Sequence, residues 1–357
     1  MKILVVGPQY PDSFARSVAV TLTAMGHQVM AVDGLRVYHQ HRRLRGLLHT
    51  YLRTAFPAFE RVSYRGLIQT AKDLQPNLVL VTYGAVPPVV IRELKESSRS
   101  KIVCWYTDAI MNLHRLYLIA SDFDAFFLKE PFLTRILREK LGLNAYHLPE
   151  CCNPIWHRRI PLTERDHQEY GCDLSAIGTL HYYRARMLEP FDGYDLKVWG
   201  SSSPKWLISP IQKYYRNHYV AEEEKAKALL ASKVVINTIH CAEIEGVNCT
   251  LFEVAGCGAF QIADWKPDLP QFFEPEYEVV TFRTRQELKE KVNYYLGHPE
   301  ERKVIAERAY ARAHREHTYE IRLKRMFEIL KLPSEGQSIG ELAASLQEDY
   351  RCATRTI

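Results

Sequence analysis

Two glutamates flank the expected start of a short helix and could together bind the hydroxyl groups of a ligand. An apolar strand is expected over 234–237, and Asn248 is suited to cap a helix over 249–256. The start of such a helix offers free backbone N–H groups and a positive dipole end, which suit a diphosphate. Glu245 precedes this start, and the side chain of Glu253 tilts back toward it. Carboxylates accept hydrogen bonds from sugar hydroxyls, so a phosphorylated sugar fits; a capped helix with two solvated glutamates is the alternative.

A glycine turn near the start of the second half of the chain is another candidate. Gly178 and Thr179 lead into a helical segment that carries Arg184 and Arg186. A guanidinium offers parallel N–H donors to a phosphate, and we assign this role to Arg184 rather than to Arg186. His181 lies in the same turn and could face a leaving phosphate. A solvated helix face and an exposed histidine are the alternatives.

A third candidate, Asp108, lies in the first half of the chain. It ends the segment 104–108, the carboxyl end of an expected strand, and could position or deprotonate an acceptor hydroxyl. Its alternative role is to cap a helix over 110–119. The loops 83–88 and 7–10 also follow expected strands. Neither is a G-x-G-x-x-G, so the sequence lacks the fingerprint of a nicotinamide-binding Rossmann fold.

These candidates all follow strands in a repeated strand–helix pattern. Apolar runs that predict strands lie at 2–6, 27–32, 77–82, 101–105, 124–128, 173–177, 194–199, 234–237, 259–263 and 278–282. Helical patterns lie at 63–74, 88–97, 111–120, 131–140, 181–190, 222–231, 249–256, 285–296, 299–315 and 318–331. The segment 149–170 contains three prolines among mixed charges and is interpreted as a linker. The pattern predicts two α/β halves in tandem, with ligands beyond the carboxyl ends of the strands, at the cleft between the halves.

The site region also resembles a known family. The spacing Glu245-x7-Glu253, followed by Ala255-Gly256-Cys257-Gly258, resembles the donor-site motif of retaining GT-B glycosyltransferases. The passage from Asn248 to Asp264 is especially similar to the CgeB-like, spore maturation protein branch and to group 1 glycosyl transferases. The segments 269–280 and 317–322 resemble further passages of the family. The likeness covers 172–331 well and the N-terminal half only in its strand–helix pattern.

The resemblance implies the GT-B fold, two Rossmann-like doubly wound domains facing across a cleft. The acceptor-binding domain would span 1–165 and the nucleotide-sugar domain 166–317. The last helix and a polar tail, 318–357, would cross back to the first domain. Sugar transfer to a hydroxyl would retain the anomeric configuration. No cofactor is expected, and the resemblance implies no essential metal ion. We also expect the sequence to lack a D-x-D motif that would hold Mg²⁺ or Mn²⁺ against the diphosphate.

The resemblance also implies roles for individual residues. Glu253 would bind the ribose and Glu245 the transferred sugar, with Glu243 as the alternative sugar contact. The backbone N–H groups of Val247, Asn248 and Cys249, which follow Gly246, would hold the diphosphate, opposite Arg184. Thr250 stands where family members often carry arginine. This departure leaves open a nucleotide-sugar-binding protein without turnover, and a transferase that acts on modified DNA bases or a sugar-nucleotide epimerase remains a further alternative.

A basic amphipathic stretch, 35–65, suggests further partners. It carries seven arginines against one glutamate, with leucines at helical spacing. It could lie on an anionic membrane surface, where lipid-linked acceptors occur, or follow a nucleic acid. An ordinary helix packed on the sheet is the alternative. The acceptor itself, whether a glycan, a lipid-linked molecule, a small molecule or a nucleic acid, is not revealed.

Composition sets the broad class. The chain has 357 residues, 46% of them hydrophobic, and a net charge of +5, as expected of two ordinary globular domains. No apolar run is long enough to span a membrane, and the N-terminus lacks the pattern of a signal peptide. The eight cysteines form no C-x-x-C pair, so reduced thiols are expected. We therefore expect a cytoplasmic location, where the basic stretch 35–65 could bind the inner face of the membrane.

Overall fold

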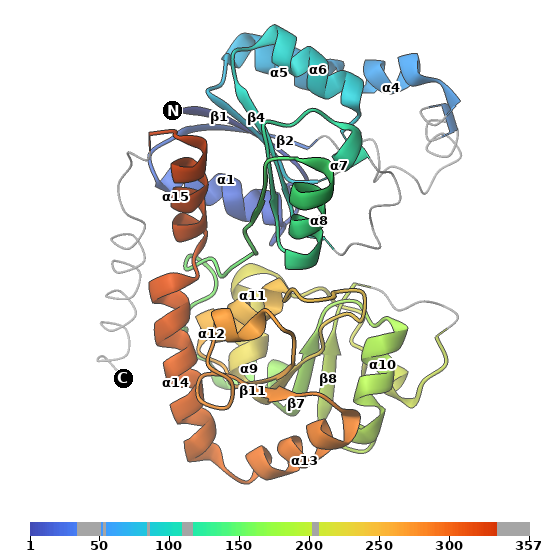
Figure 1. Cartoon of the computed structure of the whole chain (residues 1–357). Coiled ribbons are helices and arrows are strands. Elements are labelled where there is room, and N and C mark those ends of the chain that lie inside the picture. The colour runs from blue at the N-terminus through green and yellow to red at the C-terminus, as the bar shows by residue number, and fades with distance from the viewer. Residues whose placement is uncertain (34–50, 53–54, 84–85, 109–116, 202–206, 334–357) are drawn as a thin grey trace. The chain divides into compact units, whose positions relative to one another are not determined.

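The chain folds into two compact units. In this computed structural model, the described residues are 1–33, 51–52, 55–83, 86–108, 117–201 and 207–333. The N-terminal unit comprises residues 1–149 with the described residues from 323 onward, and the C-terminal unit comprises 150–322 (Figure 1). Most of the basic stretch 35–65 and the tail from 334 lie outside the described residues, so the predictions made for them stay predictions.

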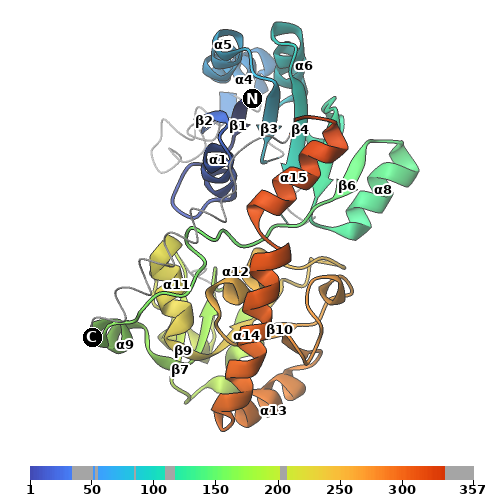
Figure 2. The same cartoon turned by 90° about the vertical axis from the view of Figure 1, so that its left-hand side faces the viewer.

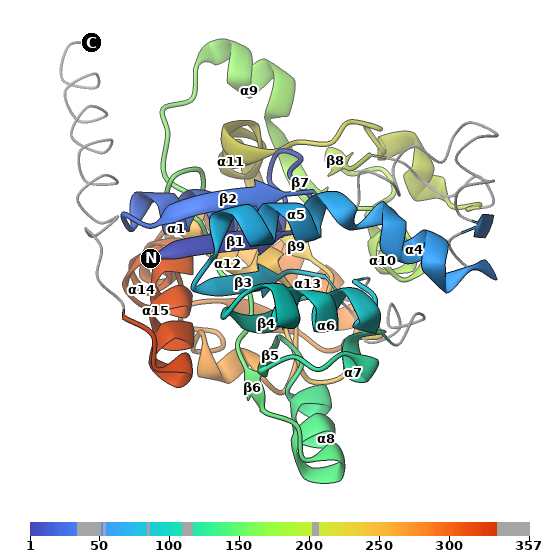
Figure 3. The ribbon, with the colours of Figure 1, turned by 90° about the horizontal axis from the view of Figure 1, so that it is seen from above.

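The N-terminal unit is built on a six-stranded parallel sheet. Its strands are β1 (Lys2–Val6), β2 (Gln28–Val32), β3 (Leu78–Val81), β4 (Lys101–Tyr106), β5 (Ala125–Leu128) and β6 (Ala145–His147). They lie in the order β2-β1-β3-β4-β5-β6, which Figure 3 shows from above. The described helices before residue 149 are α1 (Phe14–Ala24), α4 (Pro57–Ser63), α5 (Arg65–Leu74), α6 (Pro88–Ser97), α7 (Tyr117–Ala120) and α8 (Pro131–Leu141).

The C-terminal unit repeats this order with five strands. Its strands are β7 (Cys172–Ile177), β8 (Leu196–Trp199), β9 (Ser232–Asn237), β10 (Gln261–Asp264) and β11 (Val280–Phe282), arranged β8-β7-β9-β10-β11 and all parallel. Its helices are α9 (Glu164–Tyr170), α10 (Tyr182–Leu188), α11 (Glu222–Leu230), α12 (Cys249–Cys257), α13 (Arg285–Leu296), α14 (Pro299–Glu316) and the first turn of α15 (Tyr319–Leu330). Short 3₁₀ turns lie at Glu189–Phe191, Pro210–Tyr214 and Leu269–Gln271. Helix α14 packs beside α12 (Figure 2).

Most strands of both sheets are buried on both faces, which explains their apolar sequences, whereas the edge strand β2 is largely exposed. The residues of β3, β5, β8 and β10 are all buried. The largest fully buried side chains include Trp105 and Phe127 in the N-terminal unit and Phe191, Phe252 and Phe282 in the C-terminal unit. Each such side chain contributes about 1.5–3 kcal/mol by leaving water, so the strands are stabilised by burial rather than by their own propensity.

The predicted doubly wound parallel sheets are confirmed, and each predicted strand has a counterpart. Among the described strands and α-helices, β6 and α9 were missed. β6 is only three residues long, and α9 lies in the segment interpreted as a linker. That interpretation is wrong for α9, because Thr163 and Asp166 form a capping box that starts the helix despite the nearby prolines. No described helix combines the length and the apolar character needed to cross a bilayer.

The chain passes from the N-terminal to the C-terminal unit at 149/150. Cys152 helps to hold the segment after this point in the C-terminal unit: its backbone N–H donates to the carbonyl of His317, and it pairs with Thr318. Helix α15 runs across the second division, and from Leu323 onward it belongs to the N-terminal unit, where the ring of Phe327 contacts His27.

Candidate active site

In the C-terminal sheet the order of the strands reverses direction between β7 and β9. We call the carboxyl ends of these two strands the switch point of the sheet. From β7 the chain passes outward to β8 and then returns to the other side of β7 to form β9. In sheets of this kind the loops after such a pair of strands diverge and leave a crevice for a ligand. Gly178 and Thr179 follow β7, and Thr238 follows β9. The predicted phosphate-binding residues therefore lie at the switch point of this sheet.

Arg184 joins the two loops of the switch point. Its Nε donates to the Thr238 hydroxyl over 3.0 Å, and its Nη1 donates to the Thr179 carbonyl over 2.7 Å. The side chain is 8% exposed, and no carboxylate of a described residue forms an ion pair with it. Burial lowers the pKa of this guanidinium to about 10, so it remains charged at neutral pH. A buried cation without an acidic partner is costly unless an anionic ligand neutralises it.

Gly178 makes room for this guanidinium. Its φ of +113° is a conformation that side chains rarely adopt, and an added Cβ would lie 2.5 Å from Arg184 Nη1. The neighbouring Arg186 is exposed and pairs with Glu189. Of the two arginines considered from the sequence, the structure buries the one assigned to the phosphate.

His181 caps the helix that carries Arg184. Its Nδ1 accepts a hydrogen bond from the Arg184 backbone N–H, 3.3 Å away, at the start of α10. The His181 ring is half-buried and contacts the ring of His240, which follows β9. Burial, followed by the charge of Arg184 and by His240, lowers the pKa of His181 to about 3. This imidazole is therefore neutral across the physiological range.

The start of α12 is tied to the end of β9. Asn248 caps the helix as predicted, with its Oδ1 accepting from the Leu251 backbone N–H over 3.2 Å. The amides of Asn237 and Asn248 also donate to each other, over 3.1 and 2.8 Å. Gly246 and Val247 are buried in the loop before the helix, and Cys249 is its half-buried first residue. The helix start is thus held at the same sheet edge as Arg184.

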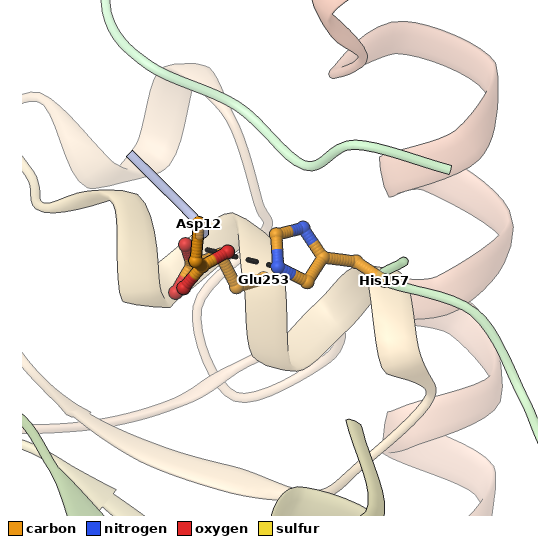
Figure 4. A group of neighbouring side chains, drawn as sticks. All are labelled: Asp12, His157 and Glu253. Carbon is orange, nitrogen blue, oxygen red and sulfur yellow. Dashed lines mark ion pairs between the residues drawn. The ribbon is translucent and has the colours of Figure 1, made fainter. Parts of the chain in front are cut away.

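Glu253 is a buried member of a charged group. It is 7% exposed, and its Oε1 accepts a hydrogen bond from Lys225 Nζ over 3.1 Å and lies 3.8 Å from His157 Nε2 (Figure 4). Burial by itself raises the pKa of the Glu253 carboxyl, but the charge of Lys225, with hydrogen bonds from Lys225 and Cys249, brings that pKa below its ordinary value. Glu253 is therefore ionised, and the alternative of a solvated glutamate is wrong for it.

The two other glutamates lie in the loop between β9 and α12. Glu245 is half-buried, and its backbone carbonyl accepts from the Asp268 N–H over 3.1 Å. Glu243 is 4% exposed, and its backbone carbonyl accepts from Lys266 Nζ over 2.5 Å. Glu245 is thus the more accessible of the two candidate sugar contacts.

Asp108 belongs to the N-terminal unit. It is exposed and follows β4. A D-x-D spacing does occur in this unit, at Asp122 and Asp124, but these residues precede β5 rather than follow it. Both carboxylates bind Lys95 Nζ, each over 3.1 Å. Their position and their lysine partner do not fit a metal-diphosphate site.

Several side chains at this edge were missed by the sequence analysis. Thr238 and His240 immediately follow β9, where the position after a strand end was the available signal. Asp264 ends β10 and accepts a 2.7 Å hydrogen bond from the Tyr183 hydroxyl, and burial raises the pKa of its carboxyl. Lys225 and His157 carried no local signal, because their role depends on a glutamate far away in the sequence.

The chain is similar to known proteins both in sequence and in fold. Residues 184–328 match the sequence model of a family described as glycosyl transferase-like. The spore protein CgeB of Bacillus subtilis (strain 168) is 26% identical over 190 residues, covering 48% of this chain and 57% of the relative. The chain thus spans little more than half the length of that curated relative.

Solved structures match nearly the whole chain. Sucrose-phosphate synthase from Thermosynechococcus elongatus superposes with a TM-score of 0.66 at 11% identity, covering 93% of this chain and 98% of the other. HepE of Anabaena, in complex with UDP and glucose, gives a TM-score of 0.66 at 13% identity, covering 93% and 99%. At these identities the likeness shows the fold, which is GT-B. The predicted resemblance to CgeB-like glycosyltransferases of this fold is confirmed.

Proposed function

We propose that this chain is a glycosyltransferase that moves a sugar from a nucleoside diphosphate to an acceptor hydroxyl. One observation carries the proposal: the buried Arg184 guanidinium has no carboxylate partner among the described residues and lies at the switch point of the C-terminal sheet. A diphosphate would neutralise it with charge-assisted hydrogen bonds. HepE, which has the same fold, was solved with UDP and with UDP-glucose, which supports a nucleotide-sugar donor.

The diphosphate would bind between Arg184 and the start of α12. The backbone N–H groups of Val247, Asn248 and Cys249 would complement the negative charge together with the helix dipole. Gly178 and Thr179 would line the opposite loop, where the absence of a side chain at Gly178 lets the backbone approach closely. His181 would face the leaving phosphate from the same turn.

Glu253 and Glu245 would bind the hydroxyl groups on either side of the diphosphate. Lys225 keeps the Glu253 carboxylate ionised and oriented, so it is ready to accept hydrogen bonds from the ribose. The more accessible Glu245 would accept from the transferred sugar. Losing Glu245 should therefore reduce turnover more than it reduces affinity for the bare nucleoside diphosphate.

The chemical step would need no protein nucleophile. The bond from the anomeric carbon to the phosphate oxygen breaks while the acceptor oxygen forms its bond on the same face, and the leaving phosphate takes the acceptor proton. Arg184 and the helix start stabilise the charge that develops on the diphosphate. Retention of configuration and metal independence are part of the proposal. Asp108 would position the acceptor hydroxyl from the N-terminal unit.

The proposal is tested by ligand binding followed by transfer. The full chain is screened by thermal shift against UDP, GDP, ADP, dTDP and their glucose, galactose and N-acetylglucosamine conjugates. A true donor raises the melting temperature by mass action. The stabilising nucleotide-sugar is then incubated with the chain, and release of the free nucleoside diphosphate is followed with and without EDTA. No stabilisation by any nucleotide would refute the donor site, and loss of release in EDTA would refute metal independence.

A further inference from the structure

Two imidazoles meet at the switch point, one from each side. His181 follows β7, and His240 follows β9, three residues after Asn237. Their ring centroids lie 4.5 Å apart in an edge-to-face arrangement. Between the same two loops runs the side chain of Arg184, whose Nε bonds Thr238. The two rings therefore flank the point at which the C-terminal sheet would receive a ligand.

The main chain sets the tautomer of both rings. The Nδ1 of His181 accepts from the Arg184 backbone N–H over 3.3 Å, and the Nδ1 of His240 accepts from the Ala242 backbone N–H over 3.0 Å. A nitrogen that accepts a hydrogen bond carries a lone pair, so the proton of each neutral ring lies on Nε2. Protonating Nδ1 would turn a hydrogen bond into a contact between two N–H groups. Each ring is thus held as an Nε2–H donor.

Both donors are available to a ligand. Among the described residues, none forms a hydrogen bond with the Nε2 of either histidine, and both atoms reach the surface. The Nη2 of Arg184 likewise has no acceptor among these residues. One cationic and two neutral donors therefore lie close together with no protein acceptor for them. This set matches a group that carries several oxygen acceptors.

We propose that His240, paired with His181, binds the diphosphate of the donor directly, and that both rings act as neutral Nε2–H donors beside the Arg184 guanidinium. This inference rests on the proposed function, because it specifies how the same site holds its ligand. A neutral pair suits this position: two further cations beside Arg184 would repel one another in the empty site, whereas two N–H groups can be buried there at lower cost. His240 then contacts the ligand directly, and one imidazole from each loop donates a hydrogen bond to the diphosphate.

Paired substitutions separate this role from a structural one. In His181→Asn and His240→Asn, the side-chain oxygen can still accept from the same backbone N–H, since asparagine is a strong helix cap and forms such local bonds. Asparagine ends short of the Nε2 position, however, and removes the ligand donor. In His181→Gln and His240→Gln, an amide N–H reaches toward the Nε2 position. The asparagine variants thus keep the cap and lose the donor, and the glutamine variants regain a donor.

Binding is measured by calorimetry on the full chain with two probes, UDP and inorganic pyrophosphate. We expect each asparagine variant to melt at the wild-type temperature and to bind both probes about tenfold or more weakly. The glutamine variants should recover part of the loss. Wild-type affinity in His240→Asn would overturn the inference and leave the ring as a loop cap. Weaker binding of UDP with unchanged binding of pyrophosphate would also overturn it, because the contact would then be to the nucleoside.

The wild-type protein supplies an independent check. With ¹⁵N-labelled histidine, the Nε2 and Nδ1 resonances of the two rings report the tautomer directly. We expect both rings as the neutral Nε2–H form before and after UDP addition, with the Nε2 resonances shifting on saturation. Unshifted Nε2 resonances in a UDP-saturated sample would overturn the inference. Failure of the wild-type chain to bind either probe would instead count against the proposed donor site as a whole.

Discussion

In both units a glycine follows the first strand of the sheet, but the side chain that packs against it differs in charge. In the N-terminal unit, a Cβ at Gly7 would lie 1.9 Å from the Thr82 hydroxyl, which donates to the Val6 carbonyl. In the C-terminal unit, a Cβ at Gly178 would lie 2.5 Å from the Arg184 guanidinium. Both sheets have the same switch-point order, so the difference arises from the side chains and not from the scaffold.

The comparison indicates what each edge can bind. Around Gly7 the polar groups satisfy one another: Thr82 bonds Val6, and the Ser13 hydroxyl bonds the Pro8 carbonyl while capping α1. Around Gly178 the buried Arg184 guanidinium and the imidazoles of His181 and His240 have N–H donors with no acceptor among the described residues. An anion would stabilise the second arrangement, in which the cation has no acidic partner among the described residues. We therefore propose that the nucleotide binds at the C-terminal sheet, and four predictions test this contrast.

The largest effect is expected on breaking the buried pair of Glu253 and Lys225. Glu253→Gln removes the carboxylate that binds the buried Lys225 ammonium, which should lower the free energy of unfolding by about 3–5 kcal/mol. Urea denaturation followed by tryptophan fluorescence measures the loss. In the N-terminal unit, Lys95→Met removes the more exposed pairs with Asp122 and Asp124 and should cost at most about 1 kcal/mol.

A double substitution distinguishes the role of Glu253 in stability from its role in nucleotide binding. Lys225→Met with Glu253→Gln should regain most of the lost stability, because no charge is left buried alone. Nucleotide affinity should stay low, since the carboxylate for the ribose is still missing. Full recovery of affinity in the double variant would show that Glu253 acts only in folding.

The next effect separates the two switch points by charge. Arg184→Met keeps the length of the side chain and removes the cation, and nucleoside diphosphate binding should weaken by about 2–5 kcal/mol. Stability should change little, because the charge has no acidic partner to lose. Thr82→Val is the matched change in the N-terminal unit and should leave nucleotide affinity unaltered. Calorimetry would contradict the contrast if both variants bound the nucleotide equally well.

The two glycines offer a smaller but closely matched test. Gly7→Ala meets Thr82 and Ala15 and should cost about 1–3 kcal/mol of stability by overpacking. Gly178→Ala adds backbone strain at φ +113°, also about 1–3 kcal/mol, and in addition displaces the Arg184 guanidinium. Both should lower the melting temperature, but only Gly178→Ala should weaken nucleotide binding. A binding loss in Gly7→Ala of the same size would remove the distinction between the edges.

How much of this could be predicted from the sequence depends on the range of the interactions. The strands were predictable because burial on both faces requires continuous apolar runs, as in Ile3–Val6. The cap at Asn248 was predictable because its partner is three residues away. The group around Glu253 was not, because Lys225 and His157 come from other elements and only the fold brings them together. Helix α9 was missed because prolines and charges masked a capping box.

Within the site, the sequence could indicate Arg184 as a phosphate contact but could not indicate that its side chain is buried. Helical spacing places it in the turn after Gly178, whereas its burial depends on Thr238, from a loop more than fifty residues later. The same holds for His240, whose pairing with His181 follows from the order of the strands. Residue types reveal which chemistry is available, and the switch point determines which residues share one ligand.

The smallest effect concerns the neutral histidines of the C-terminal unit. Burial lowers the pKa of His157 and His317 to about 4, and that of His181 to about 3, from an ordinary value of 6.5. The unfolded chain binds protons below pH 6.5 while these folded rings stay neutral, so their contribution to stability is complete above pH 6.5 and is lost as the pH falls through about 4. Between pH 7 and pH 6, each ring should cost less than about 1 kcal/mol.

Hydrogen exchange resolves this effect by unit. Among the described residues of the N-terminal unit, only His27 has a histidine pKa lowered in this way, by burial and by the N-terminal charge. After correction for intrinsic exchange rates, peptides of the C-terminal unit should therefore lose more protection between pH 7 and pH 6 than those of the N-terminal unit. His157→Gln should reduce the difference, because it removes one proton-binding site from the unfolded chain. Equal losses in both units would mean that these histidines are protonated in the folded chain, and the neutral imidazole of His181 at the switch point would then have to be abandoned as well.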